Sequence, residues 1–348
     1  MRVGESFAES NVGRKRRHNE DSYVASPPLF VVADGMGGAQ AGEVASALAA
    51  GTVRELDQDP GATGLEQVVA LIKAANLRVH ARATADASAS GMGTTMTAAI
   101  LQEDGKVAIG HVGDSRAYRL RAGRLEQLTD DHSLVAELVR RGELSPEEAA
   151  VHPQRSVITR ALGTEPDVEV DAFTVEAQDG DLFLLCSDGL TTMLDSQAIA
   201  DIIERHRQRL DVAIHSLIKA ANDRGGDDNI TAILFAVADG DGDLTGELLP
   251  LAPAAAAPGP DIEDTLHPED GVRLPPDATV IVPASAVADA LAADGLAGPN
   301  DAHAADQGAA PGPAPAEQVS VPRLVLACLV IVALTAAIVL LVFDALPR

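Results

Sequence analysis

Three aspartates of this chain lie beside a glycine at the end of an apolar run. Residues 29–33 lead into Asp34-Gly35, residues 107–112 into Gly113-Asp114, and residues 182–186 into Ser187-Asp188-Gly189. Apolar runs of this length are typical of buried strands, and Asp-Gly or Gly-Asp pairs are typical of the turns that end them. Carboxylates delivered from several strand ends to one edge form an oxygen-rich, anionic site that suits hard divalent cations. The pattern therefore indicates a metal-dependent hydrolase.

Strands and helices in a particular order must bring these aspartates together. Ser145-Pro146 is typical of a helix start, with serine as the N-cap and proline at the first helical position. Because the β-rich segments are separated by a pair of long helices, the pattern favours an α+β layered domain over a parallel βαβ sheet. The apolar patterns predict strands near residues 3–8, 22–26, 29–33, 95–101, 106–112, 116–121, 170–175, 181–186 and 229–237, and helices at residues 41–56, 64–84, 131–141, 146–150, 196–205 and 210–223.

The composition argues against several classes of function. The 348 residues carry 52 acidic and 26 basic side chains, a formal net charge of −26. Nucleic-acid binding depends on Lys and Arg that neutralise phosphates, so we expect no nucleic-acid partner. The chain has no Trp, two Tyr and six Phe, so base stacking is also disfavoured. The two cysteines, Cys186 and Cys328, suit neither a disulfide framework nor a zinc site, which favours a reducing compartment.

The sequence predicts a C-terminal membrane anchor. Residues 324–343 contain no charge, and Thr335 is their single polar residue. This is the length of a membrane-spanning helix, and the alternative, a buried globular helix, is rarely apolar on every face. Residues 1–10 lack the apolar region of a signal peptide. We therefore expect a single-pass protein of the cell membrane with a cytoplasmic catalytic domain, and Arg323 agrees with the positive-inside rule.

The segment before this anchor is predicted to be a linker. Residues 239–322 contain thirteen of the 20 prolines, fifteen acidic residues and one base, Arg273. Such a segment cannot bury enough apolar surface to fold, and its charge keeps it extended. We therefore divide the chain into a folded domain (1–238), a disordered Pro/Ala/acidic linker (239–322) and a C-terminal transmembrane anchor (323–348).

Six motifs of the folded domain contain residue types that bind metals or phosphate. Each motif alone is more typical of an ordinary turn than of a binding site, although its glycines allow a backbone group to approach a ligand closely. Together they keep one order along the chain. They are the run from Gly13 to Asp21, Asp34-Gly35-Met36-Gly37-Gly38, Gly91-Met92-Gly93-Thr94-Thr95, Gly113-Asp114-Ser115-Arg116, Ser187-Asp188-Gly189 and the run from Gly225 to Thr231.

In this order the motifs resemble those of the metal-dependent protein phosphatases, the type 2C Ser/Thr phosphatases, in their bacterial form. The resemblance covers about residues 3–238. It implies a central β-sandwich flanked by helices (four-layer αββα) and a binuclear Mn²⁺ or Mg²⁺ centre. It also implies hydrolysis of phosphoserine and phosphothreonine by a metal-activated water. The expected partners are phosphorylated proteins, including a membrane Ser/Thr kinase that the phosphatase opposes.

Site residues are carried over from the family by position. Asp34 would bridge the two metals, the carbonyl of Gly35 would bind one of them, and Asp188 and Asp228 would bind the other. Glu20 would act through a metal-bound water, with Asp21 beside it. Asp114 would help to hold a third, weaker metal, and Arg16 would bind the substrate phosphate. This set agrees with the chemistry, because a phosphomonoester dianion needs cations to enter an anionic site.

Two positions depart from the family pattern, whereas one further segment resembles a subdomain of the family. Met36 stands where eukaryotic members carry a histidine that acts as general acid, so the leaving-group proton would come from a metal-bound water or matter less. Asn11 replaces an aspartate before a turn and keeps the capping oxygen. Residues 131–165 resemble the flap subdomain beside the active site. There, Arg155 and Arg160 would meet an acidic or phosphorylated segment or form structural salt bridges.

Rival interpretations remain open. Asp241, Asp243 and Thr245 match the nucleophile motif of haloacid-dehalogenase phosphatases, but a linker follows where that fold needs a domain. The same segment mimics the start of a calcium loop, yet Leu244 replaces its glycine. The domain could also be a pseudophosphatase that binds phosphoproteins, or a regulatory phosphatase of an anti-sigma antagonist. Thr265 could be a phosphorylation site for a partner kinase, although an unmodified spacer is the simpler interpretation.

Overall fold

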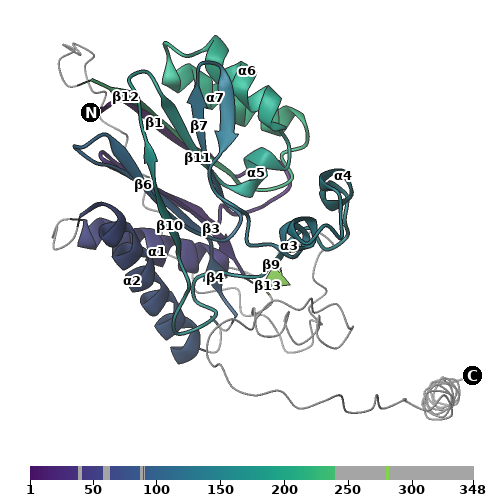
Figure 1. The fold of residues 1–348 in the computed structure, drawn as a ribbon. Helices are drawn as coiled ribbons and strands as arrows, with labels where there is room; N and C mark the ends of the chain where they lie inside the picture. Colours follow the sequence, from purple (N-terminus) through teal and green to yellow (C-terminus); the bar gives the residue numbers. More distant parts are fainter. Residues whose placement is uncertain (38–40, 58–62, 87–88, 90, 240–279, 282–348) are drawn as a thin grey trace, which may run out of the picture. The chain divides into compact units, whose positions relative to one another are not determined.

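Two antiparallel sheets lie face to face, and helices cover their outer faces (Figure 1). The computed structural model describes residues 1–37, 41–57, 63–86, 89, 91–239 and 280–281. One sheet has the order β1 (Arg2–Asn11), β12 (Ile230–Ala238), β11 (Leu182–Cys186), β7 (Arg116–Arg121), β8 (Arg124–Gln127). The other has the order β10 (Asp171–Glu176), β6 (Lys106–Val112), β5 (Met96–Leu101), β3 (Leu29–Met36), β2 (Asp21–Ser26), with β4 (Gly93–Thr94) also paired to β3.

Aromatic and branched side chains fill the space between the sheets. Phe30 stacks on Phe235 with ring centroids 4.2 Å apart, and Phe183 stacks on Phe235 at 5.2 Å. All three rings are fully buried, together with neighbours such as Val32 and Ile233. Because inward-facing residues alternate along each strand, the same strands present a second apolar face to the helices.

Each outer sheet face packs on its own helices. Helices α1 (Ala41–Leu56) and α2 (Gly64–Ala85) cover the β2–β6 sheet with small residues such as Ala45 and Ala49. Helices α5 (Asp188–Thr191), α6 (Ser196–Arg205) and α7 (Leu210–Asp223) cover the other sheet. The layers therefore follow the order helix, sheet, sheet, helix, as the family resemblance implies.

A small helical segment lies at one end of the sandwich (Figure 1). It contains α3 (Leu134–Arg140), α4 (Pro146–Ala150) and β9 (Val157–Ile158). The predicted start of α4 is confirmed, because Ser145 and Glu148 form a reciprocal capping box around Pro146. We keep the name flap for residues 131–165.

Several predicted boundaries were wrong. The strand predicted at 29–33 continues to Met36, so Asp34 lies inside β3 and not in a turn. The helix predicted at 131–141 begins only at Leu134, because Ser133 caps it through the amide of Ala136. The short elements β4, β8, β9 and α5 were not predicted, since two to four residues carry little periodic signal.

The C-terminal predictions fall mostly outside the described residues. Val280–Ile281 forms β13, which pairs in parallel with β9, so a wholly disordered linker was wrong at these two residues. The rest of the predicted linker from residue 240 onward, and the predicted anchor at 323–348, lie outside the described part of the chain. Within the described ranges, no helix has the length and apolar character needed to cross a membrane.

Candidate metal and phosphate site

Asp34 and Asp21 stand opposite each other on neighbouring strands. They are paired in the register of β2 and β3, so both carboxylates belong to one strand pair. The backbone of Asp34 is fixed on the other side, where its N–H donates to Thr95 Oγ1 at 3.0 Å and its carbonyl accepts from Thr94 Oγ1 at 2.8 Å. The threonine pair thus anchors the carboxylate expected to bridge two metals.

Gly35 is required where the chain leaves this strand pair. A Cβ atom at Gly35 would lie 2.1 Å from the carbonyl oxygen of Gly42 and 2.5 Å from that of Glu20. The amide of Gly35 also donates to the Glu20 carbonyl at 3.1 Å. The start of α1 and the Glu20 backbone can therefore approach the Asp34-Gly35 segment only because position 35 has no side chain.

The segment that contains Asp188 packs closely against the segment that contains Asp228. Asp188 opens α5, and a Cβ at Gly189 would lie 2.0 Å from the Asn229 carbonyl oxygen. Gly13, with φ +77°, comes equally close, since its Cβ would lie 2.1 Å from the carbonyl oxygen of Asp228. The glycines of three separate motifs thus allow their loops to pack against one another.

Asn229 holds the loop formed by residues 12–20. Its Nδ2 donates to the carbonyls of Val12 and His18, each at 2.9 Å, and its Oδ1 accepts from the Glu20 amide at 2.8 Å. The side chain is 3% exposed. The predicted capping oxygen of Asn11 is confirmed, because its Oδ1 accepts from the Gly13 amide at 3.0 Å.

A buried hydroxyl network fixes Asp21. Its Oδ2 accepts from Ser187 Oγ at 2.8 Å and from Thr231 Oγ1 at 2.6 Å. Ser187 Oγ in turn accepts from the Thr231 amide at 2.9 Å. Sequence reasoning gave Ser187 and Asn229 no role, although both stand inside the motifs and next to predicted ligands. Their position next to Asp188 and Asp228 in the sequence was the signal that could have identified them.

Arg16 and Asp228 form an ion pair at the mouth of the site. Arg16 Nη2 lies 2.7 Å from Asp228 Oδ2, and each side chain is about 30% exposed (30% and 27%). The predicted phosphate-binding residue and a predicted metal ligand are therefore partners in this structure. A charged pair that keeps contact with solvent exchanges readily for other charged partners.

Burial and mutual repulsion raise the pKa values of the carboxylates. For Asp34 and Asp188 the pKa lies well above its usual range, first through desolvation and then through the neighbouring aspartates. Desolvation, with Asp131 nearby, raises the pKa of Asp114 to about 7. Desolvation also raises the pKa of Asp21 to about 6 and that of Glu20 above its usual value. Because these five acids repel one another when all of them are ionised, the site favours the binding of positive charge.

The donor set fits divalent cations. Buried Oδ1 atoms of Asp188 and Asp21 have no hydrogen-bond partner, so lone pairs remain free to bind an ion. Carboxylate and carbonyl oxygens are the ligands of Mg²⁺ and Mn²⁺, and Mg²⁺ keeps several waters of its own. Within the described residues, no group of three or more Asp, Glu, His or Cys side chains is arranged to hold a metal ion by itself.

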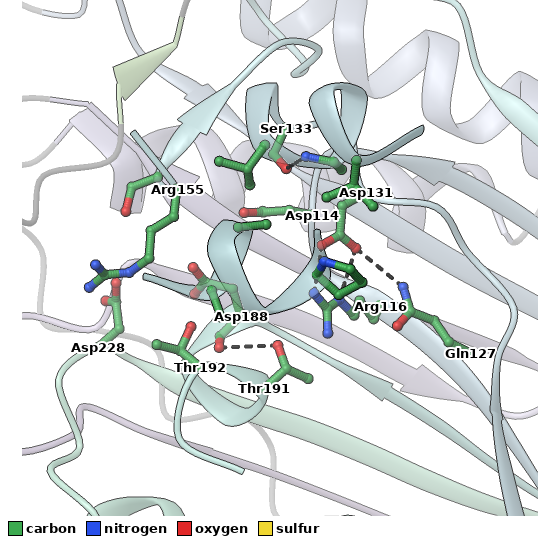
Figure 2. Close-up of a pocket in the computed structure, with 18 of the residues that line it drawn as sticks. Asp114, Arg116, Gln127, Asp131, Ser133, Arg155, Asp188, Thr191, Thr192 and Asp228 are labelled. Carbon is green, nitrogen blue, oxygen red and sulfur yellow. Dashed lines mark hydrogen bonds and ion pairs between the residues drawn. The ribbon is translucent and has the colours of Figure 1, made fainter. Parts of the chain in front are cut away.

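The cavity beside these carboxylates has a volume of about 610 Å³. Asp114, Asp188, Asp228 and Arg16 are among the residues that line it, and Figure 2 shows the three aspartates. Asp34, Gly35 and Glu20 are not part of its lining, but Asp34 interacts electrostatically with Asp114, Asp188 and Asp228. The structure therefore brings the predicted site residues of five separate motifs to one end of the sandwich.

The flap supplies the facing wall, which is apolar with basic residues. Its apolar part is formed by Val135, Ala136, Val139, Pro146, Ala149 and Ala150. Arg160 forms a structural salt bridge with Asp171 at 2.5 Å. Arg155 is exposed, lines the cavity and points toward Asp228, and its side chain has no ion pair within the described residues (Figure 2). The two arginines that the sequence left equivalent are thus distinguished.

Met36 lies beneath the flap. It is 4% exposed and packs with Ile158 and Ala161, which belong to the flap. A thioether offers no titratable proton, so this position contributes packing and no acid chemistry.

Comparison with known proteins decides the family. The family model described as protein phosphatase 2C matches residues 14–234, well over half of the chain. The chain belongs to the protein phosphatase 2C family. The matched residues include every predicted site residue from Arg16 to Asp228.

Bacterial phosphatases of this family are similar in sequence and structure. A serine/threonine phosphatase (stp) of Listeria welshimeri is 42% identical over 232 residues, which cover 64% of this chain and 91% of that protein. The phosphatase PstP of Mycobacterium tuberculosis is 41% identical over 260 residues, 74% of this chain and 49% of that protein. A crystal structure of PstP superposes with a TM-score of 0.64 at 39% identity, covering 68% of this chain and 100% of that one. The PstP catalytic domain in complex with two manganese ions superposes with a TM-score of 0.63 at 38% identity, covering 69% and 100%.

Proposed function

We propose that this protein is a metal-dependent phosphatase that removes phosphate from phosphoserine and phosphothreonine in other proteins. The observation that carries the proposal is one cavity lined by Asp114, Asp188, Asp228 and Arg16. The activities for which the Listeria and mycobacterial relatives are named support the same chemistry.

Two Mn²⁺ or Mg²⁺ ions belong to this proposal. Asp34 would bridge them, with the Gly35 carbonyl on one ion, Asp188 and Asp228 on the other, and Glu20 acting through water. When bound, the ions supply charge neutralisation and an activated water for in-line attack on phosphorus. The two manganese ions in the PstP structure support the pair. Asp114 would hold a third, weaker ion.

Arg16 would recognise the substrate phosphate. Its guanidinium lies against Asp228 and is partly exposed, so it can turn from that carboxylate to an entering phosphate. A planar guanidinium donates to two phosphate oxygens at once, which orients the ester for attack. Because Met36 has no titratable proton, position 36 cannot protonate the leaving oxygen. A metal-bound water would supply this proton, or protonation would matter less to the reaction.

The flap would bind the substrate residues that flank the phosphorylated residue. Arg155 lines the cavity and has no ion-pair partner within the described part of the chain, and most of the α3 and α4 side chains that line the cavity beside it are apolar. This wall suits a phosphopeptide with an acidic or second phosphorylated residue and apolar flanks. Flexible helical segments beside an active site commonly select substrates in this way.

We further propose that residues 324–343 anchor the protein in the cell membrane, with the phosphatase domain on the cytoplasmic side. The support is the uncharged run of twenty residues and the basic Arg323 beside it. A membrane Ser/Thr kinase would share this location, and its phosphorylated residues and substrates would be natural targets. The alternatives are a regulatory phosphatase of an anti-sigma antagonist and a pseudophosphatase that only binds.

Hydrolysis by the full chain, purified in detergent, tests this function. We expect p-nitrophenyl phosphate and a phosphothreonine peptide to be hydrolysed with Mn²⁺ or Mg²⁺ and not in EDTA. Full activity in EDTA, or undiminished activity when Asp34→Ala is combined with Asp188→Ala, would contradict the proposal. A pseudophosphatase would retain the peptide without releasing phosphate. Comparing phosphoproteins in cells with and without the protein would separate kinase-linked substrates from an anti-sigma antagonist.

A further inference from the structure

His132, near the start of the flap, binds the turn that carries Asp114. The amide of Gly113 donates to His132 Nδ1 at 3.0 Å, and the amide of His132 donates back to the Gly113 carbonyl at 2.8 Å. On the flap side, the Thr159 amide donates to the His132 carbonyl at 2.9 Å. His132 is 3% exposed, so these bonds are shielded from water.

The contacts fix one tautomer of the ring. A backbone N–H can only donate, so Nδ1 must be the unprotonated nitrogen, and the proton lies on Nε2. Nε2 then donates to Asp171 Oδ2 at 3.1 Å. Arg160 Nη1 also lies 3.0 Å from Nε2, but it is itself a donor and donates to Asp171 Oδ1. Burial, together with the charge of Arg160, lowers the pKa of His132 to about 4, so the ring is neutral at physiological pH. His132 thus offers one acceptor to the turn and one donor to β10.

Neighbouring residues hold the same segment from both sides of Asp114. Asp131 accepts two hydrogen bonds from Arg116, at 2.8 and 2.6 Å (Figure 2). The His132 ring packs against His111 with centroids 4.7 Å apart and ring planes tilted by 34°. His111 Nε2 donates to the Asp130 carbonyl at 3.0 Å. Residues 130–132 are therefore bound to Gly113 on one side of Asp114 and to Arg116 on the other.

The Gly113 turn has little freedom to find another partner. Its φ of +110° is a conformation that L side chains rarely adopt, and a Cβ there would lie 2.5 Å from Thr95 Cγ2. The Gly113 amide is buried, so without His132 it would lose its only recorded acceptor among the described residues. The turn would then have to move, and Asp114 would move with it.

We propose that His132 is a positioning residue that fixes the Asp114 carboxylate and ties it to the position of the flap. A shift of the flap at Thr159 pulls on the His132 backbone, and the ring passes this shift to the Gly113 amide. The inference rests on the proposed function, in which Asp114 helps to hold a third ion. It adds that the flap helps to set the position of the Asp114 carboxylate through His132.

Two substitutions at position 132 test the acceptor at Nδ1 and the donor at Nε2 separately. In His132→Asn the amide oxygen takes the place of Nδ1 and keeps an acceptor for Gly113, while the donor to Asp171 is lost. In His132→Gln the amide nitrogen reaches the place of Nε2 and keeps the donor, while the acceptor is lost. The pair is matched in charge and polarity, so a merely structural role would affect both alike.

The full chain in detergent, labelled with ¹⁵N, provides a readout that is independent of catalysis. In EDTA we expect the Gly113 amide to exchange at least about tenfold faster in His132→Gln than in His132→Asn, with core amides such as Leu184 unchanged. With Mn²⁺, we expect His132→Gln to require about tenfold more metal for half-maximal activity at a nearly unchanged kcat. Equal Gly113 exchange and equal Mn²⁺ requirement in the two variants would overturn the proposal.

The wild-type protein gives a test that does not depend on the folding of any variant. We expect ¹⁵N spectra to show a protonated Nε2, an unprotonated Nδ1 and a coupling between the Gly113 amide nitrogen and His132 Nδ1. A protonated Nδ1 would overturn the proposal. If Asp114→Asn leaves the Mn²⁺ requirement unchanged while the coupling is present, the ion assigned to Asp114 is wrong and the link from the flap to the turn stands.

Discussion

On one side of the cavity, buried side chains tie the loops to one another, whereas the flap helices α3 and α4 on the other side contain no buried residue. On the carboxylate side, Asn229, Ser187 and Thr231 are 3% exposed or less. The flap meets the domain through His132, through the backbone pair of Leu162 with Thr94, through the ion pair of Arg160 with Asp171 and through the packing of Ile158 on Met36. The difference separates two tasks, because metal ligands need fixed positions while substrate selection tolerates movement.

The largest expected effect comes from a proposed metal ligand on the carboxylate side of the cavity, which we call the fixed side. Asp188→Asn should lower activity on p-nitrophenyl phosphate by at least about 10³-fold, because charge neutralisation and ion binding are both impaired. In EDTA, the same variant should be more stable than wild type, since one enclosed and repelled carboxylate is removed. Each kcal/mol corresponds to about 2–4 °C in the Tm of a domain of this size. Thermal unfolding with and without Mn²⁺ measures both results.

A stable but fully active Asp188→Asn protein would contradict this account. The control is Asp201→Asn on the exposed side of α6, where Asp201 accepts from Gln197. We expect that control to change neither activity nor stability measurably.

Asn229→Ala tests how the loops are held together. It removes three hydrogen bonds to the loop of residues 12–20 and leaves buried backbone groups without partners. We expect a loss on the order of 3 kcal/mol in the free energy of unfolding, since each unsatisfied buried group costs about 1–3 kcal/mol. Activity should fall because Glu20 and Arg16 lie on this loop. Urea unfolding measures the loss, and the exposed Gln197→Ala is the control.

The pH dependence of stability tests the repulsion between carboxylates. The pKa of Asp114 is raised to about 7 in the folded protein, above the value of about 4 expected in the unfolded chain. Its contribution to stability is therefore complete below pH about 4 and is lost as the pH rises through about 7. In EDTA, the unfolding free energy should fall over this window for wild type and fall less for Asp114→Asn. Identical slopes would show that Asp114 is not strained by its surroundings.

On the flap side, Arg155→Gln should affect substrate binding and spare the chemistry. A lost charge-assisted contact of about 1.4 kcal/mol corresponds to a tenfold rise in KM for an acidic phosphopeptide. The kcat on p-nitrophenyl phosphate should stay within a factor of about two, since this small ester does not reach the wall. Arg141→Gln, an exposed flap residue outside the cavity lining, is the matched control. Equal effects of both variants on peptide KM would remove Arg155 from the substrate site.

The smallest effect is expected where β13 meets the flap. Proline at both Val280 and Ile281 removes the N–H groups that could pair with β9. Amide exchange of residues 157–158 should then accelerate about three- to tenfold, the equivalent of one net hydrogen bond. Activity on p-nitrophenyl phosphate should not change. Unaltered exchange would mean that this pairing does not stabilise the flap.

The fixed side was largely predictable from the sequence, because its geometry depends on residue types that leave a local signature. Gly35 and Gly189 are glycines since backbone carbonyls approach within about 2 Å of where a Cβ would be. Asp34 and Asp188 adjoin such glycines, and Asp228 stands two residues after Gly226, so the ordered motifs located all three. What motif spacing could not show was the register of Asp34 opposite Asp21, or the link through Asn229, because both depend on contacts between distant segments.

The flap was less predictable for a related reason. Arg155 and Arg160 look alike in sequence, and only the placement of Asp171 on β10 determines that Arg160 is paired. His132 gave no signal, since a lone buried histidine has no characteristic spacing. Short elements such as β9 and α5 carry too few residues to show a period.

The central claim is that Asp34, Asp188 and Asp228 hold two divalent cations at the fixed side of the cavity. Calorimetric titration of the EDTA-treated full chain with Mn²⁺ tests it most directly. We predict two tight sites in wild type, a third weak site that disappears in Asp114→Asn, and loss of at least one tight site in Asp188→Asn. Unchanged Mn²⁺ stoichiometry and affinity in Asp188→Asn would contradict the account.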